Sequence, residues 1–424
     1  THSLLRLPRE LMPMAARFLL FKRILRGTNA ILPLISLLPV RIFKYMIYKQ
    51  FKTLARVLGK TLWLLWLPFA VSASEFDEAQ LAASEGRYRD VITLLTGALS
   101  AEDVSELQLV VAYSNRGIAY SLLNAFGLAK QDLNAALALD PAHSLTLNQL
   151  GNLAANVDHD YELAVKFFET ATAANFGPSQ FGLARLYHLG LGVERDDEQA
   201  LALYRLAAEN QYVLAYVPLG QMYLGRTGGP QAGGPQAGGP QDDSIAVQWF
   251  IEAIKAGVVE GHYHLAVALE QGVGVARDVA NAVSQYRQAA MQGHAPAQNA
   301  LGYAYSRGVG VLQDYQLAAQ WYRLAADQGD RSAMTRLALL LAGCPRTTVC
   351  NGELAVTLAT EVLATESSAS TQNSLAAGLA RLGKFDEAIA VMRQAILDLP
   401  IGSTDELAYR NRLALYQSGE VYQF

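Results

Sequence analysis

This 424-residue chain has few of the residues and motifs on which catalytic and metal-binding sites depend. Its seven histidines form no HExxH motif and no Cys/His cluster with zinc-ligand spacing, so no metal site is predicted. Its two cysteines, Cys344 and Cys350, are too few for a disulfide-rich scaffold. Strict alternation of apolar and polar residues is absent after residue 74, which excludes a sheet-based fold there. Because a Ser-x-x-Lys motif is also missing, we predict no catalytic residue, no cofactor and no enzyme.

Charged residues are scarce, at 17% of the chain, and they are unevenly distributed. The first 74 residues contain twelve Lys or Arg and a single acid, Glu10. The remaining residues contain 22 basic and 37 acidic side chains, which gives them a net charge of −15. Because nucleic acids present negatively charged phosphates, an acidic body is a poor partner for them. We therefore expect no nucleic-acid partner.

The basic segment has the organisation of an export signal. After Met46, four basic residues precede an apolar run at 62–71, and small residues stand at −3 and −1 of a cleavage site before Ser74. The apolar run is too short to span a bilayer comfortably. We therefore predict a signal peptide at residues 46–73 and an exported mature protein. The basic residues are Lys49, Lys52, Arg56 and Lys60.

Two interpretations of the N-terminal segment remain open. In the first, residues 1–45 are an upstream segment that is not part of the true protein, and the signal peptide is removed. In the second, residues 1–73 are retained as a basic, membrane-associated arm that includes the apolar stretch Ile31 to Val40. The first predicts a protein released after export, and the second predicts one held at the membrane.

One pattern is written twice in succession between Glu260 and Gly329, with matching residues 36 positions apart. A fixed period of this length indicates stacked supersecondary units. In each copy a Gly-x-Gly turn precedes an Asp that is placed to cap a helix, and residues at +4, +8 and +11 from the Asp share one helical face. Each copy therefore predicts a helix hairpin. The copies read Gly272-Val273-Gly274-Val275, Asp278, Ala282, Tyr286, Ala289 and Gly308-Val309-Gly310-Val311, Asp314, Ala318, Tyr322, Ala325.

Shorter units flank this pattern and resemble the tetratricopeptide repeat (TPR). The unit that begins at Gly117 has small, aromatic and proline residues at the spacing of that family. Another copy opens at Gly151, 34 residues later, with one extra residue in its turn at 156–160. The same markers return between Ala376 and Pro400. The markers of the first of these units are Gly117, Tyr120, Ala129, Leu133, Ala136 and Pro141.

The longer unit resembles the Sel-one-like repeat (SLR), a relative of the TPR. The stretch Leu301-Gly302-Tyr303-Ala304-Tyr305 is close to the SLR signature. A small residue on the first helix recurs at steps of 36, 46, 36 and 36. The step of 46 contains a Gly/Pro-rich tandem insert at 227–241, which we predict to be a flexible surface loop. The recurring residues are Ala184, Gly220, Ala266, Gly302 and Ala338.

Together these resemblances imply an all-α fold, a right-handed α-solenoid of about nine antiparallel helix hairpins. An array of this type needs a polar cap, because an open end would expose an apolar face. His294, at a helix start, is expected to be structural. We assign TPR-like repeats to residues 74–177, four SLR repeats to 178–330, further TPR-like repeats to 331–402, and a C-terminal capping helix and tail to 403–424.

In TPR and SLR arrays the first helix of each pair lines a concave groove, so the resemblance implies a protein or peptide partner bound there. Asn148 and Asn152 lie at i and i+4, share a face, and are expected to grip a peptide backbone together. The alternative is that the polar residues at these marker positions are merely solvated. The candidates are Asn148, Asn152, Arg185, His188, Gln221, Glu270, Asn299 and Tyr303.

The resemblance implies a non-enzymatic interaction scaffold of the bacterial cell envelope, periplasmic or secreted, with no small-molecule cofactor. One alternative is a structural subunit of an envelope assembly or secretion complex, anchored in the inner membrane and facing the periplasm. A remote alternative is a hydrolase of the penicillin-binding SLR type. Export implies an oxidising environment, in which Cys344 and Cys350 are expected to form a small disulfide loop; the alternative is two reduced residues in a turn.

Overall fold

The computed structural model describes residues 67–225, 240–344 and 349–424. These residues form α-helices joined by short connections, together with one π-helical and one 3-10 turn, and no strand occurs among them. The all-α helical-repeat class predicted from the sequence is therefore confirmed. Residues 1–45, most of the predicted signal peptide and nearly all of the predicted insert lie outside the described residues.

The described residues from Leu67 to Val104 form a single helix hairpin, which is a compact unit of its own. Helix α4 (Leu67–Ser84) packs on α5 (Tyr88–Leu99). The chain reverses at Gly86, whose φ of +72° is a conformation that glycine adopts without steric cost. This hairpin falls within the region assigned to TPR-like repeats from residue 74, but α4 begins at Leu67 and therefore runs through the predicted cleavage site.

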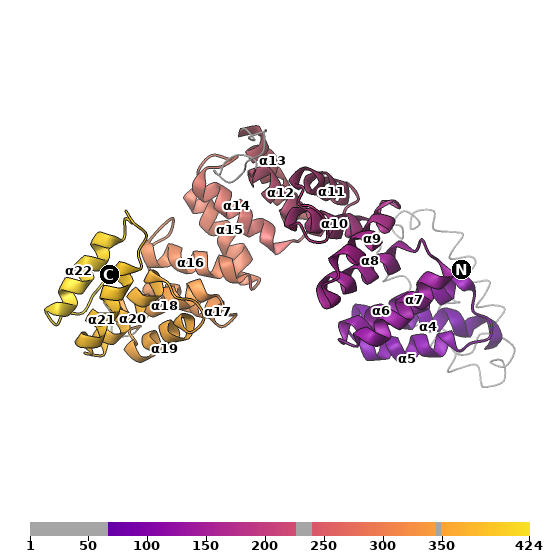
Figure 1. The fold of residues 1–424 in the computed structure, drawn as a ribbon, viewed down its shortest axis with the longest axis horizontal. Helices are drawn as coiled ribbons and strands as arrows, with labels where there is room; N and C mark the ends of the chain where they lie inside the picture. The colour runs from indigo at the N-terminus through magenta and orange to yellow at the C-terminus, as the bar shows by residue number, and fades with distance from the viewer. Residues whose placement is uncertain (1–66, 226–239, 345–348) are drawn as a thin grey trace, which may run out of the picture. The chain divides into compact units, whose positions relative to one another are not determined.

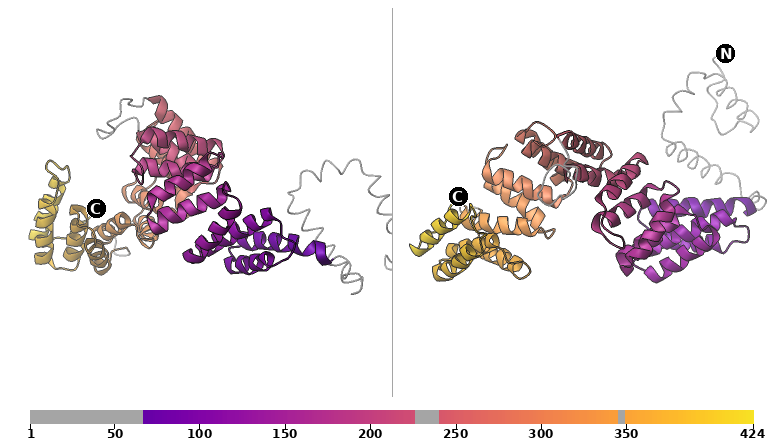
Figure 2. Two further views of the ribbon diagram at one scale, coloured as in Figure 1. Left: turned by 45° about the vertical axis from the view of Figure 1, so that its right-hand side comes forward. Right: turned by 45° about the horizontal axis from the view of Figure 1, so that its top comes forward.

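The second unit, residues 105–424, is an array of helix pairs in which each helix packs on the next one along the chain (Figures 1 and 2). We call the earlier and later helices of a pair its first and second helix. The pairs are α6 (Glu106–Leu122) with α7 (Phe126–Leu139), α8 (Ser144–Leu153) with α9 (Tyr161–Thr172), α10 (Gly177–Leu189) with α11 (Asp197–Glu209), α12 (Tyr216–Gly225) with α13 (Pro240–Lys255), α14 (Val259–Gln271) with α15 (Val279–Met291), α16 (Ala295–Arg307) with α17 (Tyr315–Ala326), α18 (Arg331–Gly343) with α19 (Gly352–Leu363), and α20 (Ala369–Arg381) with α21 (Phe385–Leu397). The predicted capping helix follows as α22 (Glu406–Gln417).

The turns between paired helices follow from their sequence. The side chains of Asp196, Asp278 and Asp314 each accept hydrogen bonds from backbone N–H groups of the following first turn, at 2.8–3.0 Å. In the preceding turn, Gly272 and Gly274 have φ values of +75° and +68°. The second glycine also permits close approach, because a Cβ there would lie 2.1 Å from the Asp243 carbonyl oxygen of the preceding pair. The predicted caps and Gly-x-Gly turns are therefore confirmed.

A large side chain of the second helix rests on a glycine of the first helix in several pairs. A Cβ added at Gly302 would lie 2.6 Å from the Tyr322 ring, and one added at Gly220 would lie 2.6 Å from the Phe250 ring. Such distances leave no room for a methyl group. Glycine at this position therefore sets how closely the two helices of a pair approach each other.

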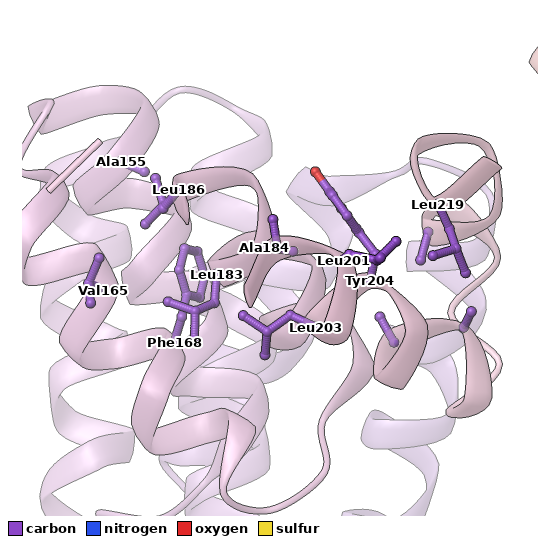
Figure 3. Packing of buried hydrophobic residues seen from close by; sticks show 14 of the residues in the cluster. Ala155, Val165, Phe168, Leu183, Ala184, Leu186, Leu201, Leu203, Tyr204 and Leu219 are labelled. Atoms are coloured by element: carbon purple, nitrogen blue, oxygen red, sulfur yellow. The ribbon is translucent and has the colours of Figure 1, made fainter. Parts of the chain in front are cut away.

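The same packing also joins neighbouring pairs. The ring of Phe168 lies against Gly151 of its own pair and against Gly182 of α10, at 2.6 and 2.8 Å from an added Cβ. Figure 3 shows Phe168 beside Leu183, with Tyr204 of the following second helix farther along the same core. Burial of apolar surface therefore continues from one pair into the next, as expected for a repeat array.

Two details differ from the sequence predictions. The extra residue in the turn after α8 is absorbed by a π-helical turn, η3 (Ala154–Asp158), followed by His159 in the left-handed conformation at a φ of 56°. In addition, α13 begins at Pro240, so the last two residues assigned to the insert at 227–241 belong to a helix. Proline is tolerated there because the first N–H groups of a helix have no intrahelical partner.

The glycine contact predicts a large effect from a small substitution. Gly302→Ala places a methyl group against the Tyr322 ring, and overpacking of this kind typically costs about 1 to 3 kcal/mol. We therefore expect a lower urea midpoint of unfolding, followed by circular dichroism. Gly127→Ala is the matched control, because Gly127 lies in α7 with nothing within 4 Å of an added Cβ. This control is expected to match or exceed the parent midpoint; equal midpoints for both variants would contradict the packing argument.

Candidate functional site

The eight candidate residues lie on first helices, as predicted, but their environments differ. Asn148 on α8 is only 4% exposed, and its Oδ1 accepts a hydrogen bond from the Ser179 hydroxyl of α10 at 3.1 Å. Asn299 on α16 is 7% exposed, and its Oδ1 accepts a hydrogen bond from Arg336 Nη1 of α18 at 2.9 Å. Both side chains therefore link one helix pair to the next. The shared grip of Asn148 and Asn152 on a peptide is not formed in this structure, because the Asn148 side chain is buried between helices.

Four of the candidates line two clefts of the array. The cleft of about 180 Å³ contains Asn152 and Arg185, and the cleft of about 230 Å³ contains Glu270 and Tyr303. Each cleft lies where the two helices of one pair meet the first helix of the next pair. We call them the N-terminal cleft and the C-terminal cleft.

The two clefts occupy the same position in the repeat. Seven residues of the first have counterparts in the second, and the members of every such couple are separated by the same number of residues. Apolar or small side chains form most of the shared wall, whereas the polar rim positions change from asparagine to glutamate and from arginine to tyrosine. The couples are Asn152 and Glu270, Tyr161 and Val279, Phe168 and Tyr286, Gly182 and Ala300, Arg185 and Tyr303, Leu186 and Ala304, and Leu191 and Val309.

The C-terminal cleft combines a carboxylate, a guanidinium and an aromatic face. The Tyr286 hydroxyl donates a hydrogen bond to Glu270 Oε2 at 2.8 Å. Burial raises the pKa of Tyr286, and the hydrogen bond to Glu270 raises it further, so the hydroxyl keeps its proton. The Arg336 guanidinium lies 5.3 Å from the centroid of the Tyr303 ring, which is 40% exposed. The cleft can therefore present both charges and a ring face to a ligand.

The N-terminal cleft is more basic at its rim. Arg185 is exposed, and His159 and Asn156 line the same cleft. Burial raises the pKa of Tyr204 to about 12, and the positive charge of Arg185 lowers it by a smaller amount. Arg185 is thus the charged group that a ligand in this cleft would meet.

His188 and Gln221 lie outside both clefts and have intramolecular partners. His188 Nδ1 is 2.8 Å from Asp197 Oδ1, and Arg195 also contacts that carboxylate. The Gln221 amide donates to His264 Nε2 at 3.0 Å. Burial lowers the pKa of His264 to about 4, so the ring is neutral near pH 7 and can accept this hydrogen bond.

Arg336 and His159 belong to the clefts but were not predicted from the sequence. His159 is placed by the π-helical turn, which has no counterpart in the other repeats that the structure describes. The position of Arg336 corresponds to Ala300 one repeat earlier, so the repeat pattern gives no signal for a charge there. By contrast, His294 was expected to be structural, and its Nδ1 accepts a hydrogen bond from the Ala297 N–H at the start of α16, at 3.2 Å.

The two cysteines stand at the end of α18. Their Sγ atoms are 2.05 Å apart and their Cα atoms 5.7 Å apart, so the structure joins them as a disulfide. Arg381 of α20 donates hydrogen bonds to the carbonyl oxygens of Ala342 and Cys344, both at 2.8 Å. The guanidinium therefore caps carbonyl groups that have no partner within their own helix, which ties α18 to the following pair.

No three His, Cys, Asp or Glu side chains in the described parts of the chain lie close enough together to hold a metal ion. None of the helices described has the length and apolarity needed to cross a lipid bilayer.

Comparison with known families places most of the array in one group. The Sel1 repeat family matches residues 148–176, 177–212, 218–258, 259–294 and 295–330. These five matches include the unit at 148–176, which we had placed among the shorter TPR-like repeats. Comparison with curated protein sequences gave no match.

Several solved structures are similar to this chain at low sequence identity. A Sel1 repeat protein from Oxalobacter formigenes is 23% identical, with 54% of this chain and 88% of that chain covered and a TM-score of 0.46. The protective antigen c5321 of uropathogenic Escherichia coli, which has an SLR fold, is 24% identical, with 76% and 77% covered and a TM-score of 0.39. The Cut9–Hcn1 complex of the APC/C is 17% identical, with 74% and 57% covered and a TM-score of 0.48.

Sel1 and TPR-like repeats generally build scaffolds for protein–protein interaction, and their proteins are typically not catalytic. The five family matches coincide with helix pairs α8 to α17 of the array. Residues 148–330 of this all-helical repeat protein are therefore Sel1 repeats.

Proposed function

We propose that this protein is a non-enzymatic scaffold of the bacterial cell envelope that holds a partner protein or peptide on the first-helix face of its array. The pair of repeat-related clefts carries the proposal. Each cleft has apolar walls and a few polar groups at its rim, which is the composition of ligand sites in general. Because the clefts recur in the register of the repeat, one extended partner can insert a side chain into each.

The rim residues indicate which partner chemistry fits. Arg185 at the N-terminal cleft favours an acidic side chain, whereas Glu270 at the C-terminal cleft favours a basic one. Tyr303 and Arg336 add a flat surface suited to an aromatic ring or a planar cation. A partner segment with opposite charges at its two ends would therefore bind in one direction only.

Export is the second part of the proposal. The signal-like segment at 46–73 supports it. The disulfide between Cys344 and Cys350 also supports it, because disulfides persist in oxidising compartments such as the periplasm. The competing proposal, an envelope subunit anchored in the inner membrane, is favoured by the twelve Lys or Arg of the first 74 residues if they are retained.

The location of the partner can be tested by site-specific photo-crosslinking in envelope extract. A photoreactive amino acid at Tyr303, in the C-terminal cleft, is expected to capture one dominant protein. Leu206 on second helix α11 is a matched control, because both side chains are 40% exposed in the native chain. Capture from Leu206 but not from Tyr303 would show that the partner binds the opposite helices.

The charge preference can be tested on the captured partner once it is purified. Glu270→Gln keeps the shape of the side chain and removes its charge, so we expect binding to weaken by about 1 to 2 kcal/mol, roughly five- to thirtyfold. Glu353→Gln on α19, which lines neither cleft, serves as the control and is expected to bind as the parent does. Isothermal titration calorimetry gives both affinities; equal values for Glu270→Gln and the parent would contradict a role for this cleft.

The two proposals for the N-terminal segment differ in the mass of the protein isolated from cells. If the signal is removed, the intact mass is that of a protein whose first residue is Ser74. An anchored subunit instead has the larger mass that includes the basic arm. The same spectrum, recorded with and without reduction before alkylation, reports the state of Cys344 and Cys350. We expect a start at Ser74 and alkylation of both thiols only after reduction; a retained arm would favour the anchored subunit.

A further inference from the structure

The segment that follows α22 turns back across earlier helix pairs. The helix ends at Gln417, the chain turns at Gly419, which has a φ of +75°, and the N–H of Glu420 donates to the Leu415 carbonyl oxygen at 2.8 Å. The next residues form no helix, and the Phe424 N–H donates to the carbonyl oxygen of Gly343, at the end of α18, at 2.9 Å. We call residues 420–424 the tail.

Two aromatic rings of the tail contact the pair α16 and α17 and the capping helix α22. Tyr422 and Phe424 are two positions apart, a spacing that places side chains on one side of an extended chain. The Phe424 ring lies 5.8 Å from the Tyr315 ring of α17 and 5.7 Å from the Arg307 guanidinium of α16. The Tyr422 ring lies 4.1 Å from the Arg412 guanidinium of α22.

Gly343 provides the floor on which both rings lie. A Cβ added there would be 2.9 Å from Tyr422 and 3.0 Å from Phe424, and its three nearest heavy atoms all belong to these two rings. Because position 343 has no side chain, there is room for the two tail rings. These rings lie closer to an added Cβ than any residue of a neighbouring helix. We call Arg307, Tyr315, Gly343 and Arg412 the tail seat.

We propose that the tail seat is a recognition site for an extended peptide segment of a partner that carries aromatic side chains at positions i and i+2, and that the tail fills this site in the structure. Extended peptides are commonly recognised by a backbone hydrogen bond combined with sites for alternate side chains. The seat offers both: the Gly343 carbonyl group at the end of α18 and two guanidinium groups over which aromatic faces can lie.

The seat is assembled without the tail. Arg307 ends α16, Tyr315 begins α17 and Gly343 ends α18, and these helices are held by their own packing. Arg412 is positioned by a hydrogen bond from its Nη1 to Asn373 Oδ1 of α20, at 2.5 Å. Removal of the tail therefore leaves the recognising groups in place and open to a partner.

The tail competes with a partner because it is tethered next to the seat. Short connections give effective concentrations on the order of 1 mM. A partner segment whose Kd for the open seat is well below this concentration can displace the tail of the full-length chain, but its apparent affinity is reduced. This site is distinct from the two clefts, and its test does not require the partner that is proposed to bind there.

The experiment compares the full-length chain with a variant that ends at Glu420. The probe is a fluorescent, amidated peptide of residues 419–424, followed by fluorescence anisotropy. We expect the shortened variant to bind it with a Kd of about 0.1 mM or lower, so that a tethered tail at about 1 mM makes the full-length chain bind it at least about tenfold more weakly. No binding to the shortened variant, or equal binding to both, would overturn the proposal.

Two controls separate recognition from general adhesion. The same peptide with alanine in place of Tyr422 and Phe424 is expected not to bind. Gly343→Leu in the shortened variant fills the space that the tail left, so it is expected to abolish binding while circular dichroism stays unchanged. If binding persists in either control, the seat does not read the aromatic pair and the proposal fails.

A second copy of this chain is the other occupant that the seat could take. If two copies exchanged tails, the full-length chain would form dimers as its concentration rises, whereas the shortened variant would stay monomeric. Analytical ultracentrifugation of both distinguishes this outcome. A tail-dependent dimer would overturn the proposal of a partner segment, and a monomer at all concentrations supports it.

Discussion

A large side chain of a second helix resting on a glycine of a first helix is the contact on which this array depends. It occurs between Gly302 and Tyr322 and between Gly220 and Phe250, and Phe168 extends it to two glycines in neighbouring pairs. Because the glycine has no side chain, the helices of a pair approach closely and the ring fills the space between them. The same buried residues continue from pair to pair, so each pair stabilises the next and none is an independent domain.

Polar side chains on the first helices serve two different purposes. Asn148 and Asn299 are buried and form hydrogen bonds to the next first helix, where an unpaired amide would be costly. Glu270 and Tyr303 stand at a cleft where neighbouring pairs leave space. The division is what a scaffold requires: some polar groups fix the register of the pairs, and others remain available to a partner.

The C-terminal end of the array is held by more than the packing of its helices. Arg381 binds the carbonyl groups at the end of α18, and the chain that follows α22 adds a further bond to Gly343. Helix ends carry carbonyl groups without intrahelical partners, so they attract both guanidinium groups and extended backbone. The end of α18, beside the disulfide between Cys344 and Cys350, is therefore fixed both by hydrogen bonds from Arg381 and by the chain that follows α22.

The sequence by itself determined the repeated parts of this protein. The period of 36, the capping aspartates and the Gly-x-Gly turns are local signals, and the structure has hairpins, caps and positive φ values where those signals lie. What only the tertiary structure decided is which marker residues are accessible. Asn148 and Asn152 look equivalent one helical turn apart, yet one is buried against α10 and the other lines a cleft, because burial depends on the neighbouring pair and not on the helix itself. Arg336 reaches the cleft across a pair boundary, and the tail reaches the end of α18 although helices α19 to α22 lie between them in the sequence, so neither contact leaves a trace in the repeat pattern.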